Sequence, residues 1–160
     1  MPTPADQAVP VYPQLQLDKQ LCFALYAATN AVTRAYRRPL AELGLTYPQY
    51  LAMLVLWQHG GQTVKSLADA LLLDSSTLTP LLQRLEAAGL IDRRRDKLDE
   101  RIVRITLSAA GSALQQAVAV VQQSVACRTR LPESELADLR SSLHALVESM
   151  AAADPAAVDP

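Results

Sequence analysis

The chain has 160 residues, of which half are hydrophobic, 4% are aromatic and 19% are charged, with a formal net charge of −1. This length predicts one domain, and the excess of alanine and leucine predicts a mostly helical chain. The composition argues against a disordered polyelectrolyte and a membrane span, and two cysteines without a secretory signal favour the cytoplasm.

Helical periodicity organises most of the chain after an arm over residues 1–17, which four prolines predict to be disordered. Six helices are expected, over residues 19–38, 50–58, 64–71, 75–88, 109–129 and 132–150. Candidate N-caps precede five of them: Asp18, Thr46, Thr63, the run Leu73-Asp74-Ser75, and Ser108. Pro39 is expected to end or kink the first helix, Gln49 completes a capping box with Thr46, and Gly89 ends the fourth helix.

Two short segments after Gly89, Leu90 to Arg94 and Arg101 to Leu107, alternate between apolar and polar residues. The polar residues 95–100 between them fit the tip of a β-hairpin. Three compact helices followed by a hairpin are typical of a winged helix-turn-helix. In that motif one helix enters the major groove of DNA and the hairpin, or wing, reaches an adjacent groove.

The outer helices are too long and too apolar to pack only on this small module. The last one has an apolar seam that a symmetric dimer would bury, formed by Leu136, Leu139, Leu143, Leu146 and Met150. We therefore expect a mostly α fold with a small β-hairpin wing (α+β), a winged helix-turn-helix homodimer with long N- and C-terminal dimerisation helices. The expected divisions are the arm at 1–17, N-terminal dimerisation helices at 18–45, the winged DNA-binding domain at 46–107, C-terminal dimerisation helices at 108–150 and a disordered tail at 151–160.

The near-neutral net charge hides an uneven distribution. Residues 84–104 carry seven cations against five acids, whereas residues 105–160 carry three arginines against six acids. Such a run can be only a solvated face. However, most of these cations are arginines, whose guanidinium fork suits phosphates and base edges, so the cluster is a candidate surface for DNA.

The expected fourth helix has two faces. Its buried face is marked by Leu78, Leu81, Leu82 and Leu85. The opposite face carries polar side chains near the helix N-terminus: Ser75, Ser76, Thr77, Thr79, Gln83 and Arg84. An ordinary amphipathic helix would show the same division. The wing cations beside it favour binding of double-stranded DNA; they are Arg93, Arg94, Arg95, Lys97 and Arg101.

The segment from Asp74 through Gly89, followed by DRRRDKLDERIVRITLSAAG, resembles the MarR family of dimeric winged-helix regulators. The pattern Asp99-x-Arg101 followed by an alternating strand carries much of this likeness, which covers about residues 20–150. The resemblance implies that Asp99 and Arg101 hold the wing tip and that Arg101 enters the minor groove. The negative potential of a narrow minor groove attracts arginine.

Both cysteines lie in the expected dimerisation helices. Cys22 is near the start of the first helix, where the helix dipole favours a thiolate, although a lone cysteine is commonly a small buried hydrophobe. Tyr36 shares its helix face but lies ~21 Å further along the helix, so these two side chains cannot touch within one chain. Cys127 lies near the end of the penultimate helix.

The cysteine in the first helix, Tyr36, Tyr47, the segment STLTPLLQRLE and the DER of the wing resemble one branch of the MarR family, the organic hydroperoxide resistance regulators with two sensing cysteines. The resemblance implies that an organic hydroperoxide oxidises Cys22 to a sulfenic acid. Tyr36 and Tyr47 of the partner subunit would hydrogen-bond its sulfur, and Cys127 of the partner subunit would resolve it into a disulfide. A repressor of this kind releases operator DNA on oxidation.

Two alternatives stay open beside this interpretation. One is a MarR-type repressor released by a small phenolic or apolar ligand in the dimer cleft, with incidental cysteines. The other is a thiol peroxidase, which would have no use for a wing. We expect that the protein is not an enzyme and that it binds no cofactor, because the sequence has no nucleotide-binding motif. We also expect no metal site, because His59 and His144 are isolated from other potential ligands.

Overall fold

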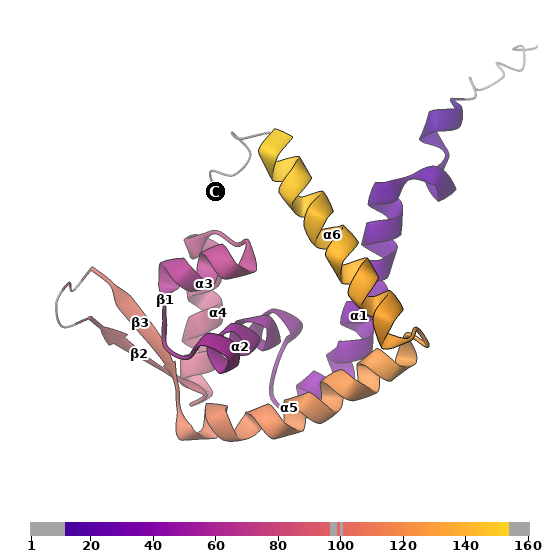
Figure 1. Cartoon of the computed structure of the whole chain (residues 1–160). Coiled ribbons are helices and arrows are strands. Elements are labelled where there is room, and N and C mark those ends of the chain that lie inside the picture. The colour runs from indigo at the N-terminus through magenta and orange to yellow at the C-terminus, as the bar shows by residue number, and fades with distance from the viewer. Residues whose placement is uncertain (1–11, 97–98, 100, 154–160) are drawn as a thin grey trace, which may run out of the picture.

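The computed structural model describes residues 12–96, 99 and 101–153. These residues form six α-helices, two short 3-10 helices and one small sheet (Figure 1). In chain order the elements are η1 (Pro13–Leu15), η2 (Leu17–Lys19), α1 (Leu21–Glu42), α2 (Tyr47–His59), β1 (Gln62–Thr63), α3 (Val64–Leu71), α4 (Ser75–Ala87), β2 (Ile91–Arg95), β3 (Val103–Leu107), α5 (Ala109–Arg128) and α6 (Glu133–Ala153). The expected mostly helical fold with a small β wing is confirmed.

Four of the five expected N-caps are confirmed. Thr46 and Gln49 form the complete capping box of α2. The side chains of Thr63, Asp74 and Ser108 each accept a hydrogen bond from a backbone N–H in the first turn of α3, α4 and α5. A capping side chain therefore marks the start of each of the helices α2, α3, α4 and α5.

The first long helix differs from the prediction at both ends. It begins at Leu21 after Gln20, and Asp18 lies instead in η2, so the expected cap at Asp18 is wrong. Its C-terminal end passes through Pro39 to Glu42. The proline removes one backbone donor, whereas Leu40, which follows it, is completely buried. Burial of that side chain offsets the cost of the proline.

The sheet has the order β1-β3-β2 and is antiparallel throughout. β2 and β3 form the predicted hairpin, in register from Ile91 opposite Leu107 to Arg95 opposite Val103. The two-residue strand β1 was not predicted, and it pairs Gln62 with Ile105. It therefore ties the segment between α2 and α3 to the inner strand of the wing.

The core lies between α2, α3, α4 and the sheet. Its largest fully buried side chains are Leu40, Met53, Leu56, Leu67, Leu78, Leu82, Leu85 and Ile105. In contrast, α6 has no buried residue, and Leu139, Leu143 and Met150 of its apolar seam are exposed. Figure 1 shows α1 and α6 extending on the side of the molecule opposite the wing, with α5 running between the two regions.

The start of α5 is fixed by a close contact that we call the α5 joint, formed by Trp57, Gly89, Leu90, Ser108 and Gly111. The Ser108 hydroxyl donates to the Gly89 carbonyl at 2.6 Å. The indole N–H of Trp57 donates to the Gly111 carbonyl at 3.0 Å. A Cβ on Gly111 would lie 2.0 Å from the Leu90 carbonyl oxygen, so only glycine fits. The joint attaches α5 to α2 and to the base of the wing.

Across the described residues, no helix has both the length and the apolar character needed to cross a membrane.

Candidate nucleic-acid interface and thiol site

The N-terminus of α4 is built around the Asp74 carboxylate. It accepts hydrogen bonds from the Ser76 hydroxyl, from the Thr77 backbone N–H at 2.6 Å and from the Thr77 hydroxyl at 2.9 Å. These bonds, that of Ser76 first, lower the pKa of Asp74 to about 2. The carboxylate is therefore ionised at neutral pH and orders the first turn of the helix.

The structure divides the polar face of α4. Ser75, Ser76, Thr77, Gln83 and Arg84 are exposed, and Thr79 is half-buried. The hydroxyl protons of Ser76 and Thr77 are directed to Asp74, and the Thr79 hydroxyl donates to the Ser75 carbonyl at 2.7 Å. Three of the four hydroxyl groups therefore hold the helix itself and offer a ligand chiefly their acceptor lone pairs.

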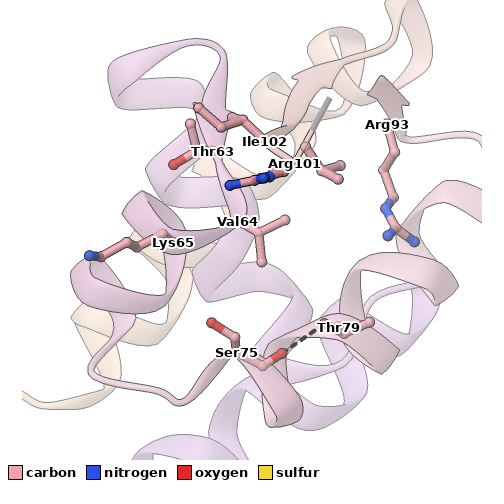
Figure 2. A pocket seen from close by; sticks show the side chains of 9 residues that line it. Thr63, Val64, Lys65, Ser75, Thr79, Arg93, Arg101 and Ile102 are labelled. Atoms are coloured by element: carbon pink, nitrogen blue, oxygen red, sulfur yellow. Dashed lines mark hydrogen bonds between the residues drawn. The ribbon is translucent and has the colours of Figure 1, made fainter. Parts of the chain in front are cut away.

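A cavity of about 470 Å³ separates α4 from the wing (Figure 2). Its lining residues are Thr63, Val64, Lys65, Ser75, Thr79, Arg93, Arg101, Ile102 and Val103. In Figure 2, Ser75 and Thr79 form its α4 wall, while Arg93 and Arg101 approach it from the wing. Three cationic side chains thus surround one concave surface beside the polar helix face, which is a suitable environment for a phosphate.

The wing tip is closed by Asp99. Its carboxylate accepts the Arg101 backbone N–H at 3.0 Å, and its carbonyl accepts the Ile102 N–H at 3.0 Å. Arg101 is exposed. The local geometry therefore brings together the two residues expected at the tip, and the Arg101 side chain lines the cavity beside α4.

The other wing cations have different surroundings. Arg93 is only 22% exposed and pairs with Glu86 at 3.5 Å, and its Nε is buried without a hydrogen-bond partner. Arg94 and Arg95 are exposed on β2. Lys97, also expected to contact DNA, lies outside the described residues.

Both cysteines are free and exposed. Cys22 is the second residue of α1, among the N-terminal residues whose N–H groups have no intrahelical partner. Cys127 is in the last turn of α5. The single chain does not bury Cys22, contrary to the alternative that this residue is a small buried hydrophobe.

Tyr36 and Tyr47, the expected partners of the sensing sulfur, lie together where α1 and α2 meet. Their ring centroids are 5.5 Å apart. Tyr36 is 8% exposed and Tyr47 is half-buried. Burial, and then the electrostatic cost of ionising Tyr47 beside Tyr36, raise the pKa of Tyr47, so its hydroxyl stays protonated at neutral pH.

A third tyrosine completes this cluster and was not singled out from the sequence. The ring of Tyr50 lies 5.1 Å from that of Tyr36 and 5.9 Å from that of Tyr47. We call these three residues the tyrosine cluster. The spacing Tyr47-x-x-Tyr50 was the available signal, because residues three apart in a helix share a face.

Among the described residues, no three histidine, cysteine or acidic side chains gather in a way that could hold a metal ion.

A three-helix module with an antiparallel wing, whose helix face and wing share a cationic cavity, defines a winged helix-turn-helix protein. Residues 45–103 match the sequence model of the MarR family. The chain is 40% identical over 139 residues to the organic hydroperoxide resistance transcriptional regulator of Bacillus subtilis, covering 87% of this chain and 95% of that protein. The chain belongs to the MarR family.

Two other relatives are similar over most of the chain. The HTH-type transcriptional regulator TtmR of Methylorubrum extorquens is 48% identical over 136 residues, covering 81% of this chain and 70% of that protein. Reduced AbfR bound to DNA superimposes with a TM-score of 0.71 at 35% identity, covering 86% of this chain and 96% of that one; AbfR is from Staphylococcus epidermidis. A disulfide-formed structure of AbfR has a TM-score of 0.62 at 35% identity, covering 85% of this chain and 95% of that one.

Proposed function

We propose that the chain is a cytoplasmic, homodimeric repressor that binds double-stranded operator DNA and releases it when an organic hydroperoxide oxidises Cys22. The observation that carries the proposal is that the same helix, α1, has an exposed thiol at its start and, toward its other end, the buried Tyr36 of the tyrosine cluster. A second copy of the chain can bring these two ends together. The similar Bacillus subtilis protein is named for organic hydroperoxide resistance.

DNA binding is assigned to α4 and the wing. The N-terminal half of α4 would enter the major groove, and Arg101 would enter the adjacent minor groove. The α4 residues of this interface are Ser75, Ser76, Thr77, Thr79, Gln83 and Arg84, and the wing residues are Arg93, Arg94, Arg95, Lys97, Asp99 and Arg101. The cationic cavity between them supports this assignment, as does the similarity to a protein whose structure was determined on DNA.

The Arg101→Ala variant tests this interface. Reduced protein should bind operator DNA more weakly, and the slope of log K against log salt should fall by ~1 if the guanidinium displaces one counterion. Arg140→Ala on α6, which removes an exposed arginine far from the wing, serves as the matched control. An unchanged salt slope and affinity in Arg101→Ala would remove Arg101 from the interface.

The proposed sensing step uses both cysteines. The Cys22 thiolate attacks the terminal oxygen of the hydroperoxide, the O–O bond breaks, and the alcohol leaves after taking up a proton. The resulting sulfenic acid then reacts with the thiol of the partner's Cys127, which forms a disulfide and releases water. Apolar side chains beside Cys22, among them Phe23, would favour an alkyl hydroperoxide over hydrogen peroxide.

Oxidation with cumene hydroperoxide tests the sensing step. Wild-type protein should leave operator DNA in a gel shift and run as a covalent dimer on a non-reducing gel. Cys22→Ser should stay on DNA and remain monomeric on that gel, whereas Cys127→Ser should form the sulfenic acid without the covalent dimer. Normal release of Cys22→Ser from DNA would end the peroxide-sensor proposal.

A second candidate is a repressor controlled by a small apolar or phenolic ligand. It is favoured by a cavity of about 380 Å³ between α2 and α5, lined by Leu54, Trp57 and Val118 together with polar side chains. A ligand of this class that releases Cys22→Ser from operator DNA in the absence of oxidant would support it. The relatives described above are named as transcriptional regulators, and no observation favours the thiol peroxidase.

A further inference from the structure

The cavity between α4 and the wing has a third wall, formed by the start of α3. Thr63 is the N-cap of this helix, Val64 and Lys65 are its first two residues, and all three line the cavity. The DNA interface assigned above uses only α4 and the wing. The start of α3 is therefore a part of this cationic surface that has no assigned role.

The polar side chains of this wall have binding capacity left. Lys65 is exposed, and within the described part of the chain it pairs with no carboxylate. The Thr63 hydroxyl accepts the Ser66 N–H at 3.0 Å, so its own proton remains to be donated. None of the described residues that line the cavity is acidic. An ammonium group without a counter-charge therefore borders a cavity that Arg93 and Arg101 also line.

The cavity also lies against the N-terminal ends of two helices, because Ser75, the first residue of α4, lines it together with the start of α3. The first N–H groups of a helix have no partner within it, and the helix dipole is positive at this end. Figure 2 shows Lys65 and Ser75 on the helical side of the cavity, with Arg93 and Arg101 toward the wing. The Asp74 carboxylate opposes this field, but it accepts the hydrogen bonds described above and does not line the cavity. The helical side therefore favours an anion.

We propose that the start of α3 is a third DNA-contact element, in which Lys65 acts with Ser75 of α4 to bind one phosphate of the operator backbone. The inference rests on the proposed function, because the occupant is the DNA that α4 and the wing would bind. Lys65 supplies the positive charge. Ser75 supplies a hydroxyl donor that no other described residue engages. A backbone contact of this kind fixes the register of α4 in the groove and carries no sequence information.

The Lys65→Ala variant tests the charge. Reduced protein should bind operator DNA and a random-sequence duplex of the same length about tenfold more weakly than wild type, by equal factors because a phosphate contact reads no sequence. The slope of log K against log salt should fall by ~1 for each bound subunit. Lys65→Arg should restore most of the binding. Lys19→Ala is the matched control, because Lys19 is an exposed lysine of η2, and it should bind DNA as wild type does.

Single methylphosphonate substitutions in the operator, each of which removes the charge of one phosphate, locate the contact. Wild-type protein should lose affinity at one backbone position in each half-site where Lys65→Ala and Ser75→Ala both lose much less. An unchanged affinity and salt slope in Lys65→Ala, or different positions for the two variants, would overturn the inference. Failure of the proposed function is distinguishable, because reduced wild-type protein would then not bind operator DNA, or Cys22→Ser would still be released by peroxide.

Discussion

Leu72 forms the turn between α3 and α4 in the left-handed conformation, with φ 53° and ψ 43°. Its N–H donates to the Asp69 carbonyl at 3.3 Å, and the Leu73 N–H donates to the Ala68 carbonyl at 3.0 Å, which closes the end of α3. Glycine is the usual residue at such a position. The Leu72 side chain is 77% exposed, so burial does not offset the strain of the backbone.

Leu72→Gly should therefore raise the free energy of unfolding by ~1 kcal/mol, the order of the cost of left-handed backbone in a residue with a Cβ. Urea unfolding at fixed protein concentration measures the change. Ala70→Gly is the matched control, because Ala70 lies within α3 and glycine inside a helix destabilises by ~0.5–1 kcal/mol. A lower midpoint for Leu72→Gly would contradict the strain argument.

Asp74 makes the stability of the first turn of α4 depend on pH. Its pKa is about 2 in the folded chain, below the ordinary value of 3.8, so its stabilising contribution is complete above pH ~4 and is lost as pH falls toward 2. Asp74→Ala should have a lower Tm than wild type at pH 7, and the two values should converge between pH 4 and pH 2.

Asp74→Asn is the control for that experiment, because asparagine is also a good N-cap but does not titrate. It should lose less Tm at pH 7 than Asp74→Ala. A Tm difference between wild type and Asp74→Ala that stays constant down to pH 2 would show that the ionised carboxylate is not what stabilises the cap.

At the scale of elements, the α5 joint makes the strictest demand on sequence. Gly111→Ala would place a methyl group 2.0 Å from a backbone oxygen, which must force α5 away from the wing. We expect a loss of ~1–3 kcal/mol in unfolding free energy, typical of overpacking, measured by urea unfolding. Ser112→Ala, at the exposed neighbouring position, should change stability by less than ~0.5 kcal/mol. Equal midpoints for Gly111→Ala and wild type would disprove the close contact.

The elements that could be predicted are those with local signals. The bounds of α3 follow from the Thr63 cap, and Asp74 and Ser108 start α4 and α5 as expected. The strand β1 could not be predicted, because two residues show no alternation and owe their pairing to β3. The continuation of α1 past Pro39 depends on the buried Leu40, a tertiary effect that outweighs the local rule.

The candidate site was predictable in its residue types more than in its bonds. Sequence placed Ser76 and Thr77 on the exposed side of α4, but their donation to Asp74 depends on the geometry of the first turn. The place of Tyr50 in the tyrosine cluster was missed because it depends on contact with a ring from α1, 14 residues away in sequence. The hydrophobic periodicity of the sequence does not encode which elements contact one another.

At the scale of the whole molecule, the apolar seam of α6 is exposed in the single chain and is the surface that we expect a second copy to cover. Leu139→Asp/Leu143→Asp should convert the protein to monomers in sedimentation equilibrium, because charges would replace two exposed leucines of the seam. Ser141→Asp, on the same helix but away from the seam, should leave the assembly unchanged. A stable dimer of the double variant would place the interface on other elements.

The α5 joint also has a mechanical consequence. Gly111 and Cys127 are 16 residues apart on one helix, a distance of ~24 Å, and the five residues of β3, which lead from the wing tip to the start of α5, span ~17 Å. If α5 and the wing turn as one rigid body about Gly111, a displacement of Cys127 is transmitted through the joint to the wing. The proposed disulfide, formed at the far end of α5 from the wing, would in this way also displace Arg101.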